Sequence, residues 1–241
     1  MLESLLIRYI DAIVVVSDSI AKWYQMKYKI RKVYVVRNFP YRLISEALNS
    51  PVLRSKYNIV DGEIIYIYHG AVGNGRGIEI ILNAFAKCDN RKHIIMMGYG
   101  ELESLINEYT NKYDNIHFHA AVKPQEVINY LSDADVGLSL IENTCESYYY
   151  SLPNKMFEYL ASGLPVITSD FPEMSKIIDE DNCGWKIQPE EGFLIELIEN
   201  ISVDDILEKK VNVKKCKDKF TWENEEKTLF EVYGDLFQNQ S

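Results

Sequence analysis

The chain has 241 residues, of which 47% are hydrophobic and 26% are charged. This is the balance of a globular protein with one large domain, or one domain and an appendage, and it excludes a disordered or low-complexity chain. The formal net charge of −10 argues against nucleic acid and anionic lipid as partners, because both are bound through cationic side chains.

The N-terminus and the cysteines both bear on the cellular compartment. Glu3, Arg8 and Asp11 interrupt the apolar N-terminal stretch, which has no basic leading segment and no small-residue cleavage site, so we expect no signal peptide. No segment approaches the ~20 apolar residues that a membrane helix requires. The cysteines are far apart and lack a paired metal-site spacing, which favours free thiols in a reducing cytoplasm. They are Cys88, Cys145, Cys183 and Cys216.

Residues 1–40 hold only one and a half βα units. The apolar run Ile13–Val16 precedes Ser17, a good first cap for a helix that we expect to continue to about Lys29. A second strand is expected at Val33–Val36. Because this is too little for a domain, we interpret residues 1–40 as the remnant of a preceding domain and a linker.

From about Tyr41 to Asp218, apolar β-branched runs alternate with segments of helical periodicity. The runs are continuous, which is typical of strands buried on both faces of a parallel sheet. This repetition predicts an α/β fold with a Rossmann-like, doubly wound parallel sheet. The expected strands are Ile64–Tyr68, Ile94–Met97, Ile116–Phe118, Val136–Leu140 and Val166–Thr168. The expected helices are Ile78–Lys87, Leu102–Tyr109, Pro124–Leu131 and Asn154–Ala161.

The spacing of apolar residues in residues 219–241 predicts one last amphipathic helix, which we expect to pack back toward the N-terminal segment. Its expected apolar side consists of Leu229, Phe230, Tyr233 and Leu236.

Ligands of open parallel sheets bind at the carboxyl ends of the strands, and the first candidate there is the segment from His69 to Gly77. Its four glycines, which include Gly70 and Gly75, let backbone N–H groups approach a ligand. The following helix N-terminus and Arg76 would favour a phosphate. The segment has neither a Walker A sequence nor the GxGxxG spacing, and an ordinary Gly-rich turn with a solvated arginine explains it equally well. His69, at the strand end, could also reach a ligand.

Two further segments lie at expected strand-to-helix junctions. Gly98 and Gly100 suit either close approach to a ligand or a tight βα turn. At Asn154 and Lys155 the chain enters a helix whose free N–H groups, with the lysine, could hold a phosphate. Glu158, about one turn later, could accept two hydroxyl hydrogen bonds from a ribose, although a surface helix with a favourable charge explains Glu158 by itself.

Three other features have a structural explanation beside a functional one. His117 and His119 share one face of a strand, but no third metal ligand is evident, so we expect packed or solvated imidazoles and no metal site. The acidic run Asp179–Asp181 is interpreted as a solvated turn. The cluster Tyr148–Tyr150 could stack on a ligand, form a lid or lie at the surface.

In this order the motifs resemble those of the retaining glycosyltransferases of glycosyltransferase family 4, or group 1, whose GT-B fold has two facing Rossmann-like lobes. The most specific part is the stretch from Leu152 to Ile167, Leu-Pro-Asn-Lys-Met-Phe-Glu-Tyr-Leu-Ala-Ser-Gly-Leu-Pro-Val-Ile. The resemblance runs from Asp11 to the end of the chain. Other matching segments, in family order, are Asp11–Ser17, Val35–Pro40, Gly70–Gly77, Gly98–Gly100 and Ser132–Val136.

The resemblance implies that residues 41–218 are the nucleotide-sugar-binding lobe. Arg76 matches the basic residue that holds the diphosphate, and Gly98 and Gly100 match glycines beside the nucleotide. Val122 and Lys123 match the segment against the base, read largely through backbone.

The helix that begins at Asn154 matches the family's phosphate-facing and sugar-facing helix N-terminus. Glu158 matches the second Glu of the family's E-x7-E pattern, which holds the ribose hydroxyls. Arg76 and Lys155 would then act as electrostatic catalysts on the leaving diphosphate.

The sequence departs from the family at three points. Tyr150 stands where the first Glu of E-x7-E would fall, and Glu146 or Glu142 could replace it. Ala71 stands where the family has a second basic residue. Nearly all of the acceptor lobe is missing from the chain.

The resemblance implies a retaining, metal-independent transferase that needs no cofactor. It would transfer a sugar from a UDP- or GDP-sugar to a surface-polysaccharide or glycolipid acceptor, in the cytoplasm or peripherally at the inner membrane face. The alternatives are a non-catalytic nucleotide-sugar-binding subunit, an inactive fragment, and a less expected GT-B epimerase, which would need acid/base carboxylates. The N-terminal strand edges and the apolar side of the last helix would seek a partner, either a second copy or a separate first-lobe protein.

Overall fold

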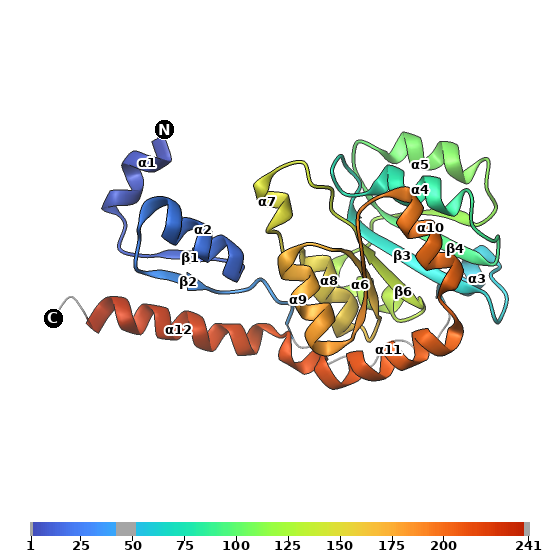
Figure 1. Cartoon of the computed structure of the whole chain (residues 1–241). Coiled ribbons are helices and arrows are strands. Elements are labelled where there is room, and N and C mark those ends of the chain that lie inside the picture. Colours follow the sequence, from blue (N-terminus) through green and yellow to red (C-terminus); the bar gives the residue numbers. More distant parts are fainter. Residues whose placement is uncertain (1, 42–51, 239–241) are drawn as a thin grey trace.

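The computed structural model describes residues 2–41 and 52–238 (Figure 1). The expected domain start at Tyr41 adjoins residues 42–51, which lie outside the described part, as do residues 239–241 at the end of the last segment. The described chain forms one six-stranded and one two-stranded sheet, and all strand pairs in both are parallel. Within the described ranges, no helix combines the length and apolar character needed to cross a membrane.

The six-stranded sheet has the strand order β5-β4-β3-β6-β7-β8. Every strand expected from the sequence in this region is present, so the predicted α/β, doubly wound fold is confirmed. The strands are β3 (Ile64–Ala71), β4 (Lys92–Tyr99), β5 (Ile116–Ala120), β6 (Val136–Ser139), β7 (Val166–Ser169) and β8 (Gly184–Ile187).

Continuous apolar runs supply two hydrophobic cores, because successive side chains of a strand point to opposite faces. In β3, Ile65 and Ile67 face one core whereas Tyr66 and Tyr68 face the other. Helices cover both faces. Those with buried side chains in the first core are α3 (Val52–Tyr57), α6 (Pro124–Leu131), α8 (Asn154–Ala161) and α9 (Pro172–Asp181). Those in the second are α4 (Ile78–Phe85), α5 (Glu103–Thr110) and α10 (Glu191–Asn200), while α11 (Val203–Cys216) contributes to both.

Two parts of the larger unit differ from the sequence-based expectation. Strand β8 was not predicted, because Gly-Trp-Lys-Ile is not an apolar β-branched run, and only its two ends are buried. The prediction of a solvated turn at Asp179–Asp181 is wrong, since these residues form the last turn of α9. Buried Met174, Ile177 and Ile178 hold that helix in the core, and Asp179 and Glu180 at its end are exposed.

The N-terminal unit consists of β1 (Ile13–Val15), α2 (Asp18–Tyr28) and β2 (Val33–Val35), preceded by α1 (Leu2–Leu6) and the short helix η1 (Ile7–Tyr9). As expected, Ser17 caps α2, and its Oγ accepts the Ile20 N–H at 3.3 Å. Lys29 ends the helix in the left-handed conformation with φ of 55°. Strands β1 and β2 pair with each other and with no other described strand.

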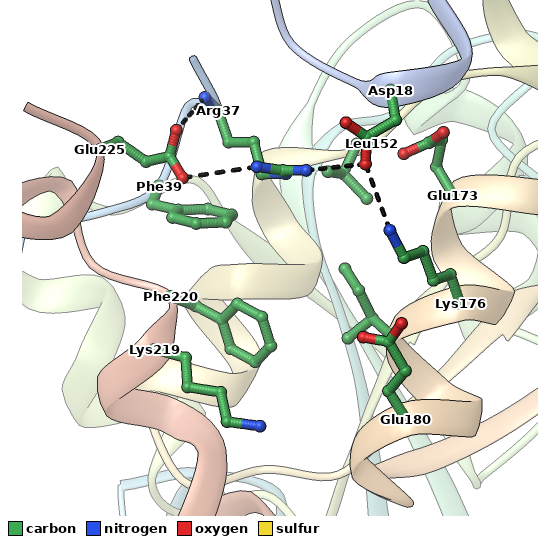
Figure 2. A pocket seen from close by; sticks show the side chains of 11 residues that line it. Asp18, Arg37, Phe39, Leu152, Glu173, Lys176, Glu180, Lys219, Phe220 and Glu225 are labelled. Carbon is green, nitrogen blue, oxygen red and sulfur yellow. Dashed lines mark hydrogen bonds and ion pairs between the residues drawn. The ribbon is translucent and has the colours of Figure 1, made fainter. Parts of the chain in front are cut away.

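An ion-pair network joins the two units (Figure 2). The Arg37 Nη2 donates to Asp18 Oδ2 at 3.0 Å, and Lys176 Nζ of α9 donates to the same oxygen at 3.2 Å. The Arg37 backbone N–H donates to Glu225 Oε2 of the last helix at 2.7 Å. The hollow between these groups also contains Phe39 and other apolar side chains, but none of the site residues predicted from the sequence.

The last helix, α12 (Trp222–Gln238), follows the short helix η2 (Lys217–Lys219) and extends away from the larger unit on the side of the two-stranded sheet (Figure 1). Its first backbone N–H, at Trp222, donates to the Pro40 carbonyl at 2.8 Å. Phe230 and Tyr233 of the predicted apolar side are 69% and 52% exposed, whereas Val232, which was not part of that predicted side, is buried. This helix therefore presents aromatic side chains to solvent.

Candidate functional site

The strand order creates a crevice at the carboxyl edge of the six-stranded sheet. Strand β3 lies between β4, which follows it in the chain, and β6, which follows β5. The chain connections therefore leave β3 and β6 in opposite directions, and such switch points are where open α/β sheets bind ligands. The segment after β3 and the start of α8 meet at this crevice. Gly98 lies near the end of β4 and Gly100 directly follows it, and Val122 and Lys123 follow β5, so the fold brings all of the predicted site segments to one edge.

Lys155 is the most unusual group in the crevice. Its side chain is buried, and its Nζ has no hydrogen-bond partner among the described residues. The ammonium nitrogen lies 3.6 Å from the centroid of the Tyr68 ring. Burial and the nearby charge of Arg76 hold the pKa of Lys155 well below its usual value, while Glu158 opposes them. A buried lysine without an acceptor is costly, so a ligand anion would gain a strong interaction there.

Arg76 supplies a second cationic group beside Lys155. It is half-buried in the Gly-rich segment and makes no ion pair with a described carboxylate. Its charge reaches both Lys155 and the Tyr68 hydroxyl. A forked guanidinium and a buried amine in one crevice can bind an anion with several oxygens.

Glu158 lies one turn into α8, where its Oε2 is 3.0 Å from His69 Nε2 of β3. Burial raises the pKa of Glu158, but the hydrogen bond and charge of His69, with the charge of Lys155, outweigh burial and leave that pKa below its usual value. The carboxylate is therefore ionised at neutral pH. Its side chain remains 41% exposed, so it can still accept hydroxyl donors.

Carboxylates and an aromatic ring hold the Gly-rich segment in place. The Gly77 N–H donates to Glu142 Oε1 at 3.1 Å, so a protein carboxylate already uses one donor at the start of α4. Asn74 donates its backbone and side-chain N–H groups to Glu101 Oε1. At Gly75, which has φ of +76°, an added Cβ would lie 2.6 Å from the Tyr148 ring. The segment is thus a fixed loop closed by α7 (Glu146–Tyr149) rather than an open turn.

The glycines at the end of β4 have a packing role. A Cβ at Gly98 would lie 1.9 Å from the Gly70 carbonyl oxygen, and a Cβ at Gly100 would lie 2.4 Å from the Val72 carbonyl oxygen. Only glycine allows the two chain segments to approach this closely. The tight-turn explanation of these residues therefore holds whether or not a ligand also lies beside them.

The other predicted residues lie at the rim of the crevice. Asn154 and Lys123 are exposed, and Val122 is half-buried. Lys123 directly precedes α6, and its backbone N–H donates to Glu126 Oε2 at 3.2 Å. His117 lies outside the crevice, at the amino ends of the strands, where its Nε2 is 3.1 Å from His93 Nδ1. His119 packs against Tyr130.

The sequence pattern missed two contacts that shape the crevice. The Tyr68 ring beneath Lys155 came from a run interpreted as core, and His69 was expected to reach a ligand rather than Glu158. Of the two candidates to replace the family Glu at Tyr150, Glu142 bonds Gly77, and Glu146 Oε2 accepts the Trp23 indole N–H at 3.1 Å.

Comparison with known proteins yields a consistent result. Residues 63–202 match the sequence family described as glycosyl transferases group 1. A probable glycosyltransferase, WbjE of Pseudomonas aeruginosa, is 26% identical over 151 residues, which cover 60% of this chain and 37% of the relative.

Solved structures show the same fold. Sucrose-phosphate synthase from Thermosynechococcus elongatus superposes with a TM-score of 0.81 at 20% identity, covering 99% of this chain and 61% of the synthase. Anabaena Alr3699/HepE, solved in complex with UDP and glucose, has a TM-score of 0.78 at 13% identity, covering 96% of this chain and 65% of its own. The expected GT-B architecture is thereby confirmed, and the chain spans less than two thirds of the length of each of these relatives.

Proposed function

The chain belongs to the group 1 glycosyl transferases, and from this premise we propose that its six-stranded sheet binds the nucleotide-diphospho-sugar donor of a retaining sugar transfer. The observation that carries the proposal is that two basic side chains, Lys155 and Arg76, lie near each other at the switch point between β3 and β6. Lys155 is buried without an acceptor, and a diphosphate would supply one.

The proposed chemistry uses the crevice as an electrostatic catalyst. Arg76 and Lys155 meet the charge that develops on the diphosphate as the bond to the sugar breaks. Glu158, held by His69, accepts the ribose hydroxyls through the part of its carboxylate that remains exposed. In this arrangement the leaving group is stabilised by side-chain cations, without a metal ion or other cofactor.

UDP or GDP is the proposed nucleotide, and the UDP found in the HepE complex supports the first. The base would lie against Val122 and Lys123, with Gly98 and Gly100 beside the nucleotide and Gly70, Gly75 and Asn154 beside the phosphates or sugar. A surface polysaccharide or glycolipid is the proposed acceptor, in keeping with a structural neighbour, WaaG, involved in lipopolysaccharide biosynthesis. The proposed location is the cytoplasm, including its face of the inner membrane.

A second candidate function is nucleotide-sugar binding without catalysis by this chain. Tyr150 in place of the family glutamate, with Glu142 and Glu146 both bonded elsewhere, favours it. The two candidates share the donor site and differ in whether acceptor transfer is measurable.

The donor site is tested by isothermal calorimetry with UDP and GDP. We expect Arg76→Ala to weaken binding by about 1.5–3 kcal/mol, the range for a hydrogen bond to a charged group. Arg76→Lys should recover part of the loss, because a point charge replaces a fork. Arg91→Ala is the matched control, since Arg91 is exposed before β4 and pairs with Asp89. Unchanged binding of both nucleotides by Arg76→Ala would refute the site, and binding abolished by EDTA would refute metal independence.

A further inference from the structure

A second hollow of about 250 Å³ lies between α2 of the N-terminal unit and α7 of the larger unit. Its lining combines three aromatic side chains with one isoleucine, one glutamate and one serine. The lining residues are Ile20, Trp23, Tyr24, Glu146, Ser147 and Tyr150. This hollow is separate from the ion-paired junction around Arg37, with which it shares no lining residue.

The aromatic rings of the hollow are partly accessible and held in place. Trp23, Tyr24 and Tyr150 are half-buried, and the Trp23 and Tyr24 rings meet edge to face with centroids 5.0 Å apart. Lys27 Nζ lies over the Trp23 ring at 4.0 Å and occupies one of its two faces. The Tyr150 carbonyl accepts the Ser17 hydroxyl at 3.2 Å, which ties this residue to the start of α2.

Glu146 adds a fixed, exposed acceptor to the aromatic lining. Its Oε2 accepts the Trp23 indole N–H at 3.1 Å, and no other described residue donates to its Oε1. An apolar wall with one oriented polar group is the usual composition of a small-molecule site. Rings with an apolar face, combined with a carboxylate that accepts hydroxyl protons, suit a pyranose, which has C–H faces and equatorial hydroxyls.

Helix α7 places this hollow beside the donor crevice. Tyr148 of α7 lies against Gly75 of the Gly-rich segment. Tyr150, which follows α7, is separated from Asn154 at the start of α8 by only three residues. The two faces of one short element therefore border the proposed diphosphate site and the aromatic hollow.

We propose that the hollow between α2 and α7 binds a neutral pyranose ring of the acceptor, with Trp23 and Tyr150 contacting the ring and Glu146 accepting its hydroxyls. The role of this sugar as the acceptor rests on the proposed function, whereas sugar binding at this place does not. Because the charged group of the lining is a carboxylate, an anionic sugar is disfavoured by like-charge repulsion.

Tryptophan fluorescence can report on this hollow directly, since the chain has tryptophan at positions 23, 185 and 222 and at no others. The double variant Trp185→Phe/Trp222→Phe retains Trp23 as its one emitter. With UDP at saturation, this variant is titrated with the methyl glycosides of glucose, mannose and galactose, and with methyl glucuronide as the anionic counterpart. A saturable emission change is expected with at least one neutral glycoside and a weaker one with the glucuronide.

Two variants and two controls assign the signal to the hollow. Glu146→Gln and Tyr150→Leu in the same background should each weaken glycoside binding roughly tenfold, as expected for losing a hydrogen bond to a charged group or a ring contact. Tyr233→Leu, on the exposed side of α12, should not change it. Trp23→Phe in the natural background, which leaves the other two tryptophans, should show no saturable change.

The outcomes separate the two proposals. If UDP binds but no glycoside alters Trp23 emission, the sugar site is refuted and the donor site stands. If a glycoside binds with full affinity to both Glu146→Gln and Tyr150→Leu, the assignment to this hollow is refuted. If a glycoside binds and neither UDP nor GDP does, the sugar site is supported and its role as an acceptor subsite falls with the proposed function.

Discussion

His69 contacts one carboxylate oxygen of Glu158 and thereby determines which part of this carboxylate is available to a ligand. The imidazole Nε2 lies 3.0 Å from one carboxylate oxygen, and this contact helps to hold the pKa of Glu158 below its usual value although burial opposes it. The His69 backbone N–H in turn donates to the Tyr159 hydroxyl at 2.9 Å, which donates to the Leu138 carbonyl of β6. Helix α8, which carries Glu158 and Tyr159, is therefore held by contacts with both strands that border the crevice.

Replacing this carboxylate tests the proposed ribose contact. We expect Glu158→Gln to weaken UDP binding by about 1.5–3 kcal/mol and to weaken 2′-deoxy-UDP binding less, because an ionised acceptor bonds hydroxyls more strongly than an amide does. Calorimetry with both nucleotides measures the difference. Glu196→Gln, on the exposed face of α10, is the control. Equal losses for the two nucleotides would contradict the assignment.

The lowered pKa of Lys155 leads us to predict that donor binding is coupled to the uptake of a proton. Burial and Arg76 depress its pKa in the free chain, whereas a bound diphosphate would raise that pKa. Between these two pKa values the free amine is neutral and the bound amine is charged, so affinity falls as pH rises through this window. Calorimetry with UDP-glucose in buffers of different ionisation enthalpy counts the protons taken up. Uptake should disappear in Lys155→Met, and equal uptake by both chains would exclude Lys155 as its source.

At the scale of elements, the contact between the ends of β3 and β4 depends on one missing side chain. A Cβ at Gly98 would lie 1.9 Å from a backbone oxygen of β3, which cannot move without disturbing the strand pair. We expect Gly98→Ala to lower the free energy of unfolding by about 1–3 kcal/mol, as overpacking does. Urea unfolding measures this loss.

The matched control for Gly98 is Gly192→Ala in α10, where an added Cβ has nothing within 4 Å. This change should leave stability unaltered or raise it by up to ~1 kcal/mol through helix propensity. Equal stability of the two variants would show that the β3–β4 contact yields easily.

At the scale of the whole molecule, exposed apolar side chains gather on the N-terminal unit and α12. Tyr9 is 87% exposed, Met26 is 76% exposed, and Phe230 and Phe237 of α12 are 69% and 67% exposed. Strands β1 and β2 form a sheet with no third described strand. Surfaces of this kind favour association.

We therefore predict that the 241-residue chain self-associates unless a separate first-lobe protein covers this surface. Sedimentation velocity over a range of protein concentrations should show a rising sedimentation coefficient. The double variant Phe230→Glu/Phe237→Glu should reduce that rise, because it places charges on the apolar side of α12. A chain that sediments as a monomer at every concentration would show the prediction to be wrong.

Local patterns were sufficient for most of the fold and for the kinds of residue in the site. Buried strands and amphipathic helices have characteristic spacings of apolar residues along the sequence. For this reason β3 to β7 and helices such as α6 and α8 were predictable from periodicity. Glycines, an arginine and a lysine next to strand ends were enough to suggest an anion site. Strand β8 was not predicted, because it lies at the edge of the sheet and an edge strand needs no continuous apolar run.

Only the tertiary structure decided how these parts act together. The position of β6 beside β3 creates the crevice, and no local pattern encodes which strands become neighbours. The burial of Lys155 over Tyr68, the bond from His69 to Glu158, and the hollow shared by Trp23 and Glu146 join residues far apart in the chain. Periodicity shows that a side chain turns inward, but the partner that it meets there is set by the packing of distant elements.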